Sequence, residues 1–86
     1  MSYIALDGYG FIRAERIVTI GKGNSAPMRR LLASLPRDKV VYLTGGRRRQ
    51  SVVLLDTGHA VVTAVAAEVL HARLAGLEPG RPEEDE

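Results

Sequence analysis

Apolar residues fall into short blocks along the 86-residue chain, and glycine-rich stretches separate these blocks. The first block, Tyr3 to Leu6, has β-compatible composition and runs into DGYG, so it predicts a strand followed by a turn. The stretch FIRAERIVTIG comes next, and its residues Ile17, Val18 and Ile20 form a β-branched run. We expect a second extended region here.

The apolar pattern becomes helical after the break GKGNS. Ser25 can act as an N-cap, and Pro27 is tolerated in a first helical turn. Apolar side chains then recur at helical spacing at Met28, Leu31, Leu32 and Leu35. This pattern predicts a helix over residues 26–35 that ends before Pro36.

Two runs of strand composition, KVVYLT and SVVLLD, flank the segment GGRRRQ. Their separation and the paired glycines predict an antiparallel hairpin with the arginines at or near its tip. The short connection TGH leads into AVVTAV, which we expect to be the third strand of a meander. From Ala66 a second helix is predicted, with Gly76 near its end and one face formed by Val69, Leu70, Leu74 and Leu77.

The three strand-like runs at residues 40–43, 52–55 and 60–65 are apolar on both faces. An antiparallel sheet in a small monomer usually leaves one face polar. Two helices can cover one face, so we expect a second subunit to cover the other, with sheet faces or edges shared between subunits. The expected fold is therefore an α/β protein of the α+β type: an antiparallel β-meander with two short helices, assembled into a homo-oligomer.

The length fits one domain, which we assign to residues 1–77; residues 78–86 form an acidic tail that we expect to be disordered. The chain has no cysteine, so we expect no disulfide framework and a reducing, cytoplasmic setting. No stretch has the pattern of a secretory signal or the length of a membrane span. We expect no membrane partner, and association with the nucleoid if the protein binds DNA.

Charge is distributed unevenly along the chain. The formal net charge is +2, but residues 78–86 hold five acidic side chains and one arginine. Residues 1–77 keep 11 of the 12 basic and 5 of the 10 acidic side chains, which gives this part a net charge of +6. Ten of the twelve bases are arginine, whose planar fork suits phosphate oxygens and guanine edges, although coding bias explains part of this excess. The balance favours nucleic acid as a partner.

Arg47, Arg48 and Arg49 are three adjacent cations that repel one another, and a hairpin turn gains nothing from them. Their cost suggests an acidic partner such as duplex DNA. The alternative is a solvated charged tip that only blocks edge-to-edge aggregation. Further bases that could join this surface are Arg13, Arg16, Lys22, Arg29 and Arg30. For Arg16, beside Glu15, an ion pair or an intersubunit contact is an equally open interpretation.

Few residues suit catalysis, so we expect no enzyme activity. His59, in the turn after Asp56, is more simply a turn residue than a ligand, and His71 is expected on a helix surface. Asp56 and His59 lack a third partner at metal-ligand spacing, so we expect no metal site, no cofactor and no small-molecule substrate. The glycines of GYG and GKGNS match no complete phosphate-binding fingerprint, and we interpret them as loop and capping geometry.

The chain resembles the RemA family of extracellular matrix regulatory proteins in four stretches, which occur in the family's order and at nearly its spacing. These stretches are GYGFIRAERIVTI, NSAPMRRLL, GGRRRQSVVLLD and GHAVVTAVAAEVLHARL. The resemblance runs from about Gly8 to Leu74. It implies a small α/β subunit that forms a ring-like homo-oligomer, binds DNA and acts on transcription of matrix and biofilm genes.

The resemblance also implies roles for individual residues. Arg47 and Arg48, after Gly46, match the arginine pair assigned to DNA contact, and Arg16 matches an arginine before the β-branched run. Pro27 matches a functionally important proline, which we interpret as a fixed helix start that aims Arg29 and Arg30. The family pattern usually reads Gly-Arg-Arg-Thr-Arg, so Arg49 rests on charge and proximity.

The leading hypothesis is a transcriptional regulator that presents repeated arginine loops to duplex DNA. Tryptophan is absent and aromatic residues are few, which leaves little material for stacking single-stranded bases. Two alternatives from other classes are a scaffold oligomer whose basic loop contacts acidic proteins, and an RNA-binding protein that uses the same loop.

Overall fold

The computed structural model describes residues 2–76, so Met1, Leu77 and the predicted acidic tail at residues 78–86 lie outside the described residues. The elements along the chain are β1 (Tyr3–Ala5), β2 (Phe11–Arg13), η1 (Ala14–Arg16), β3 (Ile17–Lys22), α1 (Ala26–Ser34), η2 (Arg37–Lys39), β4 (Val40–Leu43), β5 (Ser51–Leu55), β6 (Ala60–Thr63) and α2 (Ala67–Gly76). None of the helices within residues 2–76 has the length and apolar character needed to span a bilayer.

The strands form two sheets. β1 and β2 make an antiparallel pair, and the other four strands form a sheet in the order β3-β5-β6-β4. Within that sheet β5 is antiparallel to both β3 and β6, whereas β4 is parallel to β6. Two sheets that are mostly antiparallel, together with two α-helices, make this an α+β fold, as expected.

The predicted hairpin between the segments KVVYLT and SVVLLD is wrong, because β6 lies between β4 and β5. All four β6 residues are buried, whereas Val41 and Tyr42 of β4 are exposed, as expected for a central strand and an edge strand. The connection over residues 44–50 is long enough to cross the end of β6, a span of about 10 Å for two strand spacings. The other half of the predicted meander is confirmed, since β5 and β6 form a hairpin around Gly58.

The single extended region predicted after the first turn is also wrong. The 3-10 turn η1 separates β2 from β3, and these strands belong to different sheets. The chain must leave one layer and enter the next at this point, and a single straight strand cannot do so.

Both helices lie where the apolar spacing predicts them. The Ser25 hydroxyl oxygen accepts a hydrogen bond from the Met28 amide at 3.3 Å and caps α1. In α2, Leu70 is fully buried and Leu74 partly so, but Val69 is 41% exposed. Val69 therefore does not lie on the buried face, because it sits about 100° around the helix from Leu70.

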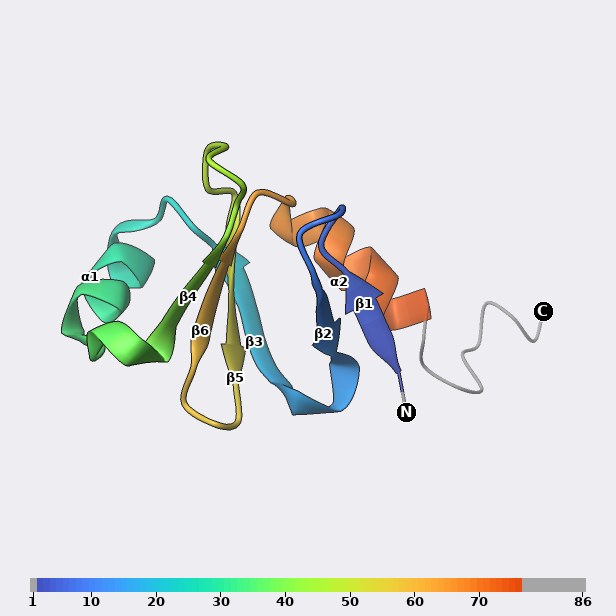
Figure 1. Cartoon of the computed structure of the whole chain (residues 1–86), viewed down its shortest axis with the longest axis horizontal. Helices are drawn as coiled ribbons and strands as arrows, with labels where there is room; N and C mark the ends of the chain where they lie inside the picture. Colours follow the sequence, from blue (N-terminus) through green and yellow to red (C-terminus); the bar gives the residue numbers. More distant parts are fainter. Residues whose placement is uncertain (1, 77–86) are drawn as a thin grey trace.

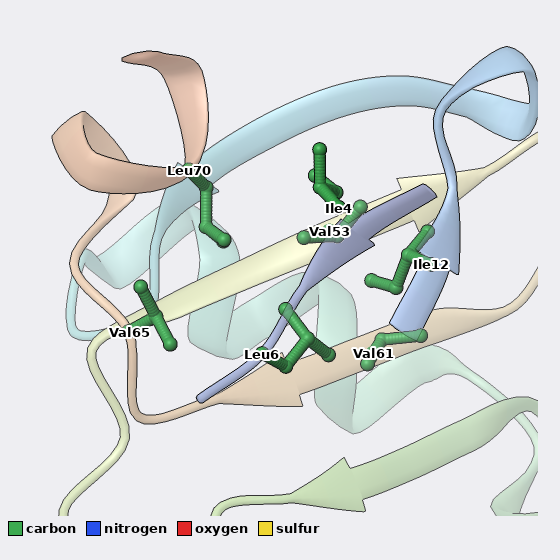
Figure 2. Packing of buried hydrophobic residues seen from close by; sticks show 7 residues of the cluster. All are labelled: Ile4, Leu6, Ile12, Val53, Val61, Val65 and Leu70. Atoms are coloured by element: carbon green, nitrogen blue, oxygen red, sulfur yellow. The ribbon is translucent and has the colours of Figure 1, made fainter. Parts of the chain in front are cut away.

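Figure 1 shows three layers, with the four-stranded sheet in the middle, α1 on one side, and α2 with the β1–β2 hairpin on the other. Alternate residues of the central strands point into the two interfaces. On the α1 side Val52, Ala60 and Val62 are buried, and Met28, Leu32, Leu35, Val40 and Leu54 pack against them. Figure 2 shows the opposite cluster, which consists of Ile4, Leu6, Ile12, Val53, Val61, Val65 and Leu70.

The chain therefore covers both faces of its own sheet. The expectation of two apolar faces is confirmed, but the expectation that both helices share one face is wrong, and no second subunit is needed to cover the other. What the sheet leaves open is its two edges. Val18 on edge strand β3 and Tyr42 on edge strand β4 are each 64% exposed.

Two buried hydroxyl groups join the strand ends beneath the connection at residues 44–50. The hydroxyls of Ser51 and Thr63 lie 3.0 Å apart, and Ser51 donates to the Val65 carbonyl at 2.7 Å. Thr63 also accepts from the Val65 amide at 2.9 Å. These bonds fix the start of β5 to the end of β6, because buried polar groups are costly to leave unpaired.

We predict that Thr63→Val lowers the free energy of unfolding by about 1–3 kcal/mol, because the isosteric change leaves the buried Val65 amide without its acceptor. Chemical denaturation measures the loss. Thr19→Val on the exposed part of β3 is the matched control and should change stability by less than about 0.5 kcal/mol. Equal effects of the two substitutions would contradict this account of the strand ends.

Candidate nucleic-acid interface

The three adjacent arginines lie at the end of the sheet where β3, β4 and β6 terminate and both α-helices begin (Figure 1). This end carries the loop after β3, the loop at residues 44–50 and the loop that leads into α2. We call residues 44–50 the arginine loop. The turn between β5 and β6 lies at the opposite end of the sheet.

A tight turn begins the arginine loop. The Arg47 amide donates to the Thr44 carbonyl at 3.1 Å, and both central residues have positive φ, +62° for Gly45 and +82° for Gly46. Two consecutive positive φ values are typical of a type I′ turn and disfavour side chains with a Cβ. Gly46, expected to have a positioning role, lies at one of these two positions.

Gln50 fixes the other end of the loop. Its amide donates to the Thr63 carbonyl at 2.8 Å, and its own carbonyl accepts from the Gly23 amide at 3.0 Å. The loop is thereby bonded to β6 on one side and to the segment before α1 on the other. Arg48 and Arg49 are held between two fixed ends.

Asn24, Arg48, Arg49 and Gln50 line a polar hollow of about 430 Å³. All four side chains are exposed. The aliphatic stem of Arg49 passes directly over Gly23, where an added Cβ would lie 2.9 Å from Cγ of Arg49. Arg49, expected from charge and proximity alone, is therefore seated by packing next to the hollow.

The local field at this end of the sheet favours anions. The N-termini of α1 and α2 each add a partial positive charge to that of the three arginines. In α1 the Ser25 hydroxyl already accepts from the Met28 amide, and Pro27 has no amide proton to donate. Lys22 lies 3.9 Å from Glu68, but both side chains are at least 70% exposed, so this ion pair is worth no more than about 1 kcal/mol.

Arg29 and Arg30 lie on the exposed side of α1 and do not line the hollow. Met28 and Leu32 pack against the sheet. Arg29 and Arg30 follow Met28 and therefore lie about 100° and 200° further around the helix. Pro27 lies in the first turn of α1, where it was expected. The two arginines thus extend the basic surface along the outside of the helix.

Arg16 is not brought to the arginine loop. It pairs with Asp56 at 3.3 Å, beside the start of β3, and the strand from Ile17 to Lys22 separates it from the loop by about 17 Å. The intramolecular ion pair is thus formed, with both side chains roughly half exposed. The structure gives Arg16 no place in the hollow.

Asn24 and Gln50 were not recognised as site residues from the sequence. Asn24 follows Gly23 and Gln50 follows the arginines, so the only sequence signal is their proximity to glycine and cations. Pairing the two loops requires the strand order, which is non-local.

His59 lies at the opposite end of the sheet, with Nδ1 2.7 Å from the Thr57 hydroxyl. Within residues 2–76 no group of three potential metal ligands occurs.

We predict that Gly23→Ala displaces Arg49, because the new methyl would overlap its stem and press on the Ser51 amide. The arginine Nε–Hε resonances in a nitrogen-15 spectrum report the change. Gly76→Ala is the control, since a Cβ there meets nothing within 4 Å. An Arg49 resonance that stays in place in Gly23→Ala would contradict the packing of Arg49 on Gly23.

Comparison with known proteins matches residues 5–74 to the family model described as RemA-like, extracellular matrix regulatory protein A-like. A protein of Synechococcus sp. (strain JA-2-3B'a(2-13)) is 33% identical over 81 residues, covering 92% of this chain and 91% of its own. A Geobacillus sp. (strain WCH70) protein is 37% identical over 73 residues, covering 83% and 84%. One from Oleidesulfovibrio alaskensis is 38% identical over 68 residues, covering 77% and 81%. Each carries a provisional name as a regulatory protein.

Proposed function

Because the chain belongs to the RemA-like family of extracellular matrix regulatory proteins, we propose that it is a transcriptional regulator that binds duplex DNA through the arginine loop. The family and the names of its relatives point to a regulatory protein. The main support for DNA binding is that exposed Arg48 and Arg49 line one hollow. This hollow lies at the end of the sheet where both helices begin. Control of matrix and biofilm genes follows from the resemblance.

The arrangement suits a phosphate backbone. Arginine presents planar, fixed donors that bind phosphate oxygens in pairs, and helix N-termini add further donors and partial charge. Each phosphate that the protein neutralises on duplex DNA contributes about 0.9 to the slope of log affinity against log salt. Duplex DNA is favoured over single strands because the chain has no tryptophan, one phenylalanine and three tyrosines, which is little material for stacking unpaired bases.

Base contacts are available from the same hollow. Arginine reads guanine in the major groove, and asparagine or glutamine reads adenine, each through paired hydrogen bonds. Arg48 and Arg49 share the hollow with Asn24 and Gln50, so both types of reader lie together. A modest sequence preference on top of phosphate binding is therefore part of the proposal.

Self-association completes the proposed function. The two open edges, β3 with Val18 and β4 with Val41 and Tyr42, expose apolar side chains that suit contact with another copy. Because the edges differ, a contact between them is heterologous and closes into a ring when the rotation permits. Cyclic symmetry would then repeat every arginine loop at one radius and height, which multiplies weak contacts along a DNA duplex.

The proposed role involves binding without catalysis, at the nucleoid in the cytoplasm. Glu68 lines a neighbouring pocket with Asn24 and Gln50, and it is exposed and paired with Lys22. An arrangement of this kind offers donors for an anion but no acid and base facing one another.

We predict that Arg47→Ala and Arg48→Ala each weaken binding to duplex DNA at about 0.1 M salt, by roughly three- to tenfold for one subunit and more when the loop is repeated. Fluorescence anisotropy over a salt series also reports the slope, which should become shallower by about 0.9 for each phosphate that the variant no longer neutralises.

Arg37→Ala is the matched control, because Arg37 is exposed in η2, before β4 and away from the arginine loop. It removes the same charge from the opposite end of the sheet. Unchanged DNA affinity in the Arg47 and Arg48 variants would contradict the proposal. An equal loss of DNA affinity in the Arg37 variant would also contradict it. Binding of an RNA duplex in preference to DNA would point instead to the RNA alternative.

A further inference from the structure

Tyr9 lies in the turn that joins β1 to β2, at the same end of the molecule as the arginine loop (Figure 1). The turn closes through a bond from the Leu6 amide to the Gly10 carbonyl at 2.8 Å and one from the Tyr9 amide to the Leu6 carbonyl at 3.2 Å. Tyr9 is 38% exposed, so the residue is only partly covered. A polar turn could have carried a small side chain at this position.

The ring of Tyr9 lies against Gly45, the first central residue of the turn that begins the arginine loop. A Cβ built on Gly45 would overlap Cε1 and Cζ of Tyr9. Next to this contact, Gly10 lies beside Leu43, and a Cβ on Gly10 would be in ordinary van der Waals contact, 3.4 Å from a leucine methyl carbon. The β1–β2 turn therefore lies beside the end of β4, and its Tyr9 ring packs on the loop that follows β4.

The hairpin that carries Tyr9 is itself held in place by α2. Arg73 pairs with Asp7 at 2.8 Å and donates to the Ala5 carbonyl at 2.7 Å. Ile4 on β1 and Leu6, just after this strand, are buried in the core. The Tyr9 ring thus connects a fixed hairpin to a loop that has no regular secondary structure of its own.

We propose that Tyr9 is a positioning residue for the arginine loop. Its ring closes one side of the Thr44–Arg47 turn, so that Gly45 keeps its left-handed conformation and Arg47 leaves the turn in a fixed direction. Gly45 is then required twice, for its φ of +62° and for the space that the ring occupies. Tyr9 acts through Gly45 and does not itself contact DNA. This inference rests on the proposed function for its biological meaning.

Amide hydrogen exchange tests the positioning without DNA. In Tyr9→Ala the Arg47 amide, which donates to the Thr44 carbonyl, should exchange about tenfold faster or more, as local opening becomes easier. The Gln50 amide, bonded to the Thr63 carbonyl, should keep its rate and serves as the internal control. Tyr9→Phe retains the ring and should match the parent protein. Unchanged Arg47 exchange in Tyr9→Ala overturns the inference.

A double-substitution cycle tests the route through Gly45. Gly45→Ala should weaken duplex DNA binding in the parent protein, and by at least about threefold less in the Tyr9→Ala background, where the methyl has room. Additive effects overturn the proposed route. So does weaker binding by Tyr9→Ala with parental Arg47 exchange, because Tyr9 would then contact DNA directly. If no variant or parent protein binds DNA while Arg47 exchange still responds to Tyr9, the proposed function fails and the positioning of the loop stands.

Discussion

The insertion of β6 between β4 and β5 determines where the three adjacent arginines of this protein lie. β6 is buried at all four positions and takes the centre of the sheet, with alternate side chains in the two hydrophobic clusters. Its central place prevents β4 and β5 from pairing, so the chain must cross the end of β6 between them. The arginine loop is that crossing. Its far end bonds to the Thr63 carbonyl of the strand that it crosses and to the Gly23 amide beyond.

A loop held in this way can carry three adjacent cations at a tolerable cost. Mutual repulsion between exposed charges is weak in water and is screened within about 10 Å at 0.1 M salt. The fixed ends limit the conformational entropy that the loop would otherwise lose on binding. The rest of the molecule supports this arrangement from both sides: Gly23 provides a surface for the stem of Arg49, and Tyr9 lies against Gly45.

Local patterns predict the parts of the fold that depend on neighbouring residues. The Ser25 cap, both helices and the β5–β6 hairpin follow from capping, apolar spacing and turn residues. The parallel pairing of β4 with β6 joins strands that are not consecutive, and a run of valines is equally compatible with either neighbour. The same non-local step hides the hollow, because Asn24 meets Gln50 only when the strand order is known. Arg16, which its charge and its match to the family pattern assigned to the DNA surface, pairs with Asp56 beside the start of β3, and its contact with DNA stays a prediction.

We propose that the chain assembles through its open sheet edges and that the assembly binds duplex DNA with its arginine loops. Native mass spectrometry of the full chain, alone and with a short duplex, tests both at once. We predict a mass that is an integral multiple, above one, of the 9.3 kDa subunit, which increases by the mass of the bound duplex when DNA is added. A 9.3 kDa species whose mass does not change when the duplex is added would contradict the account.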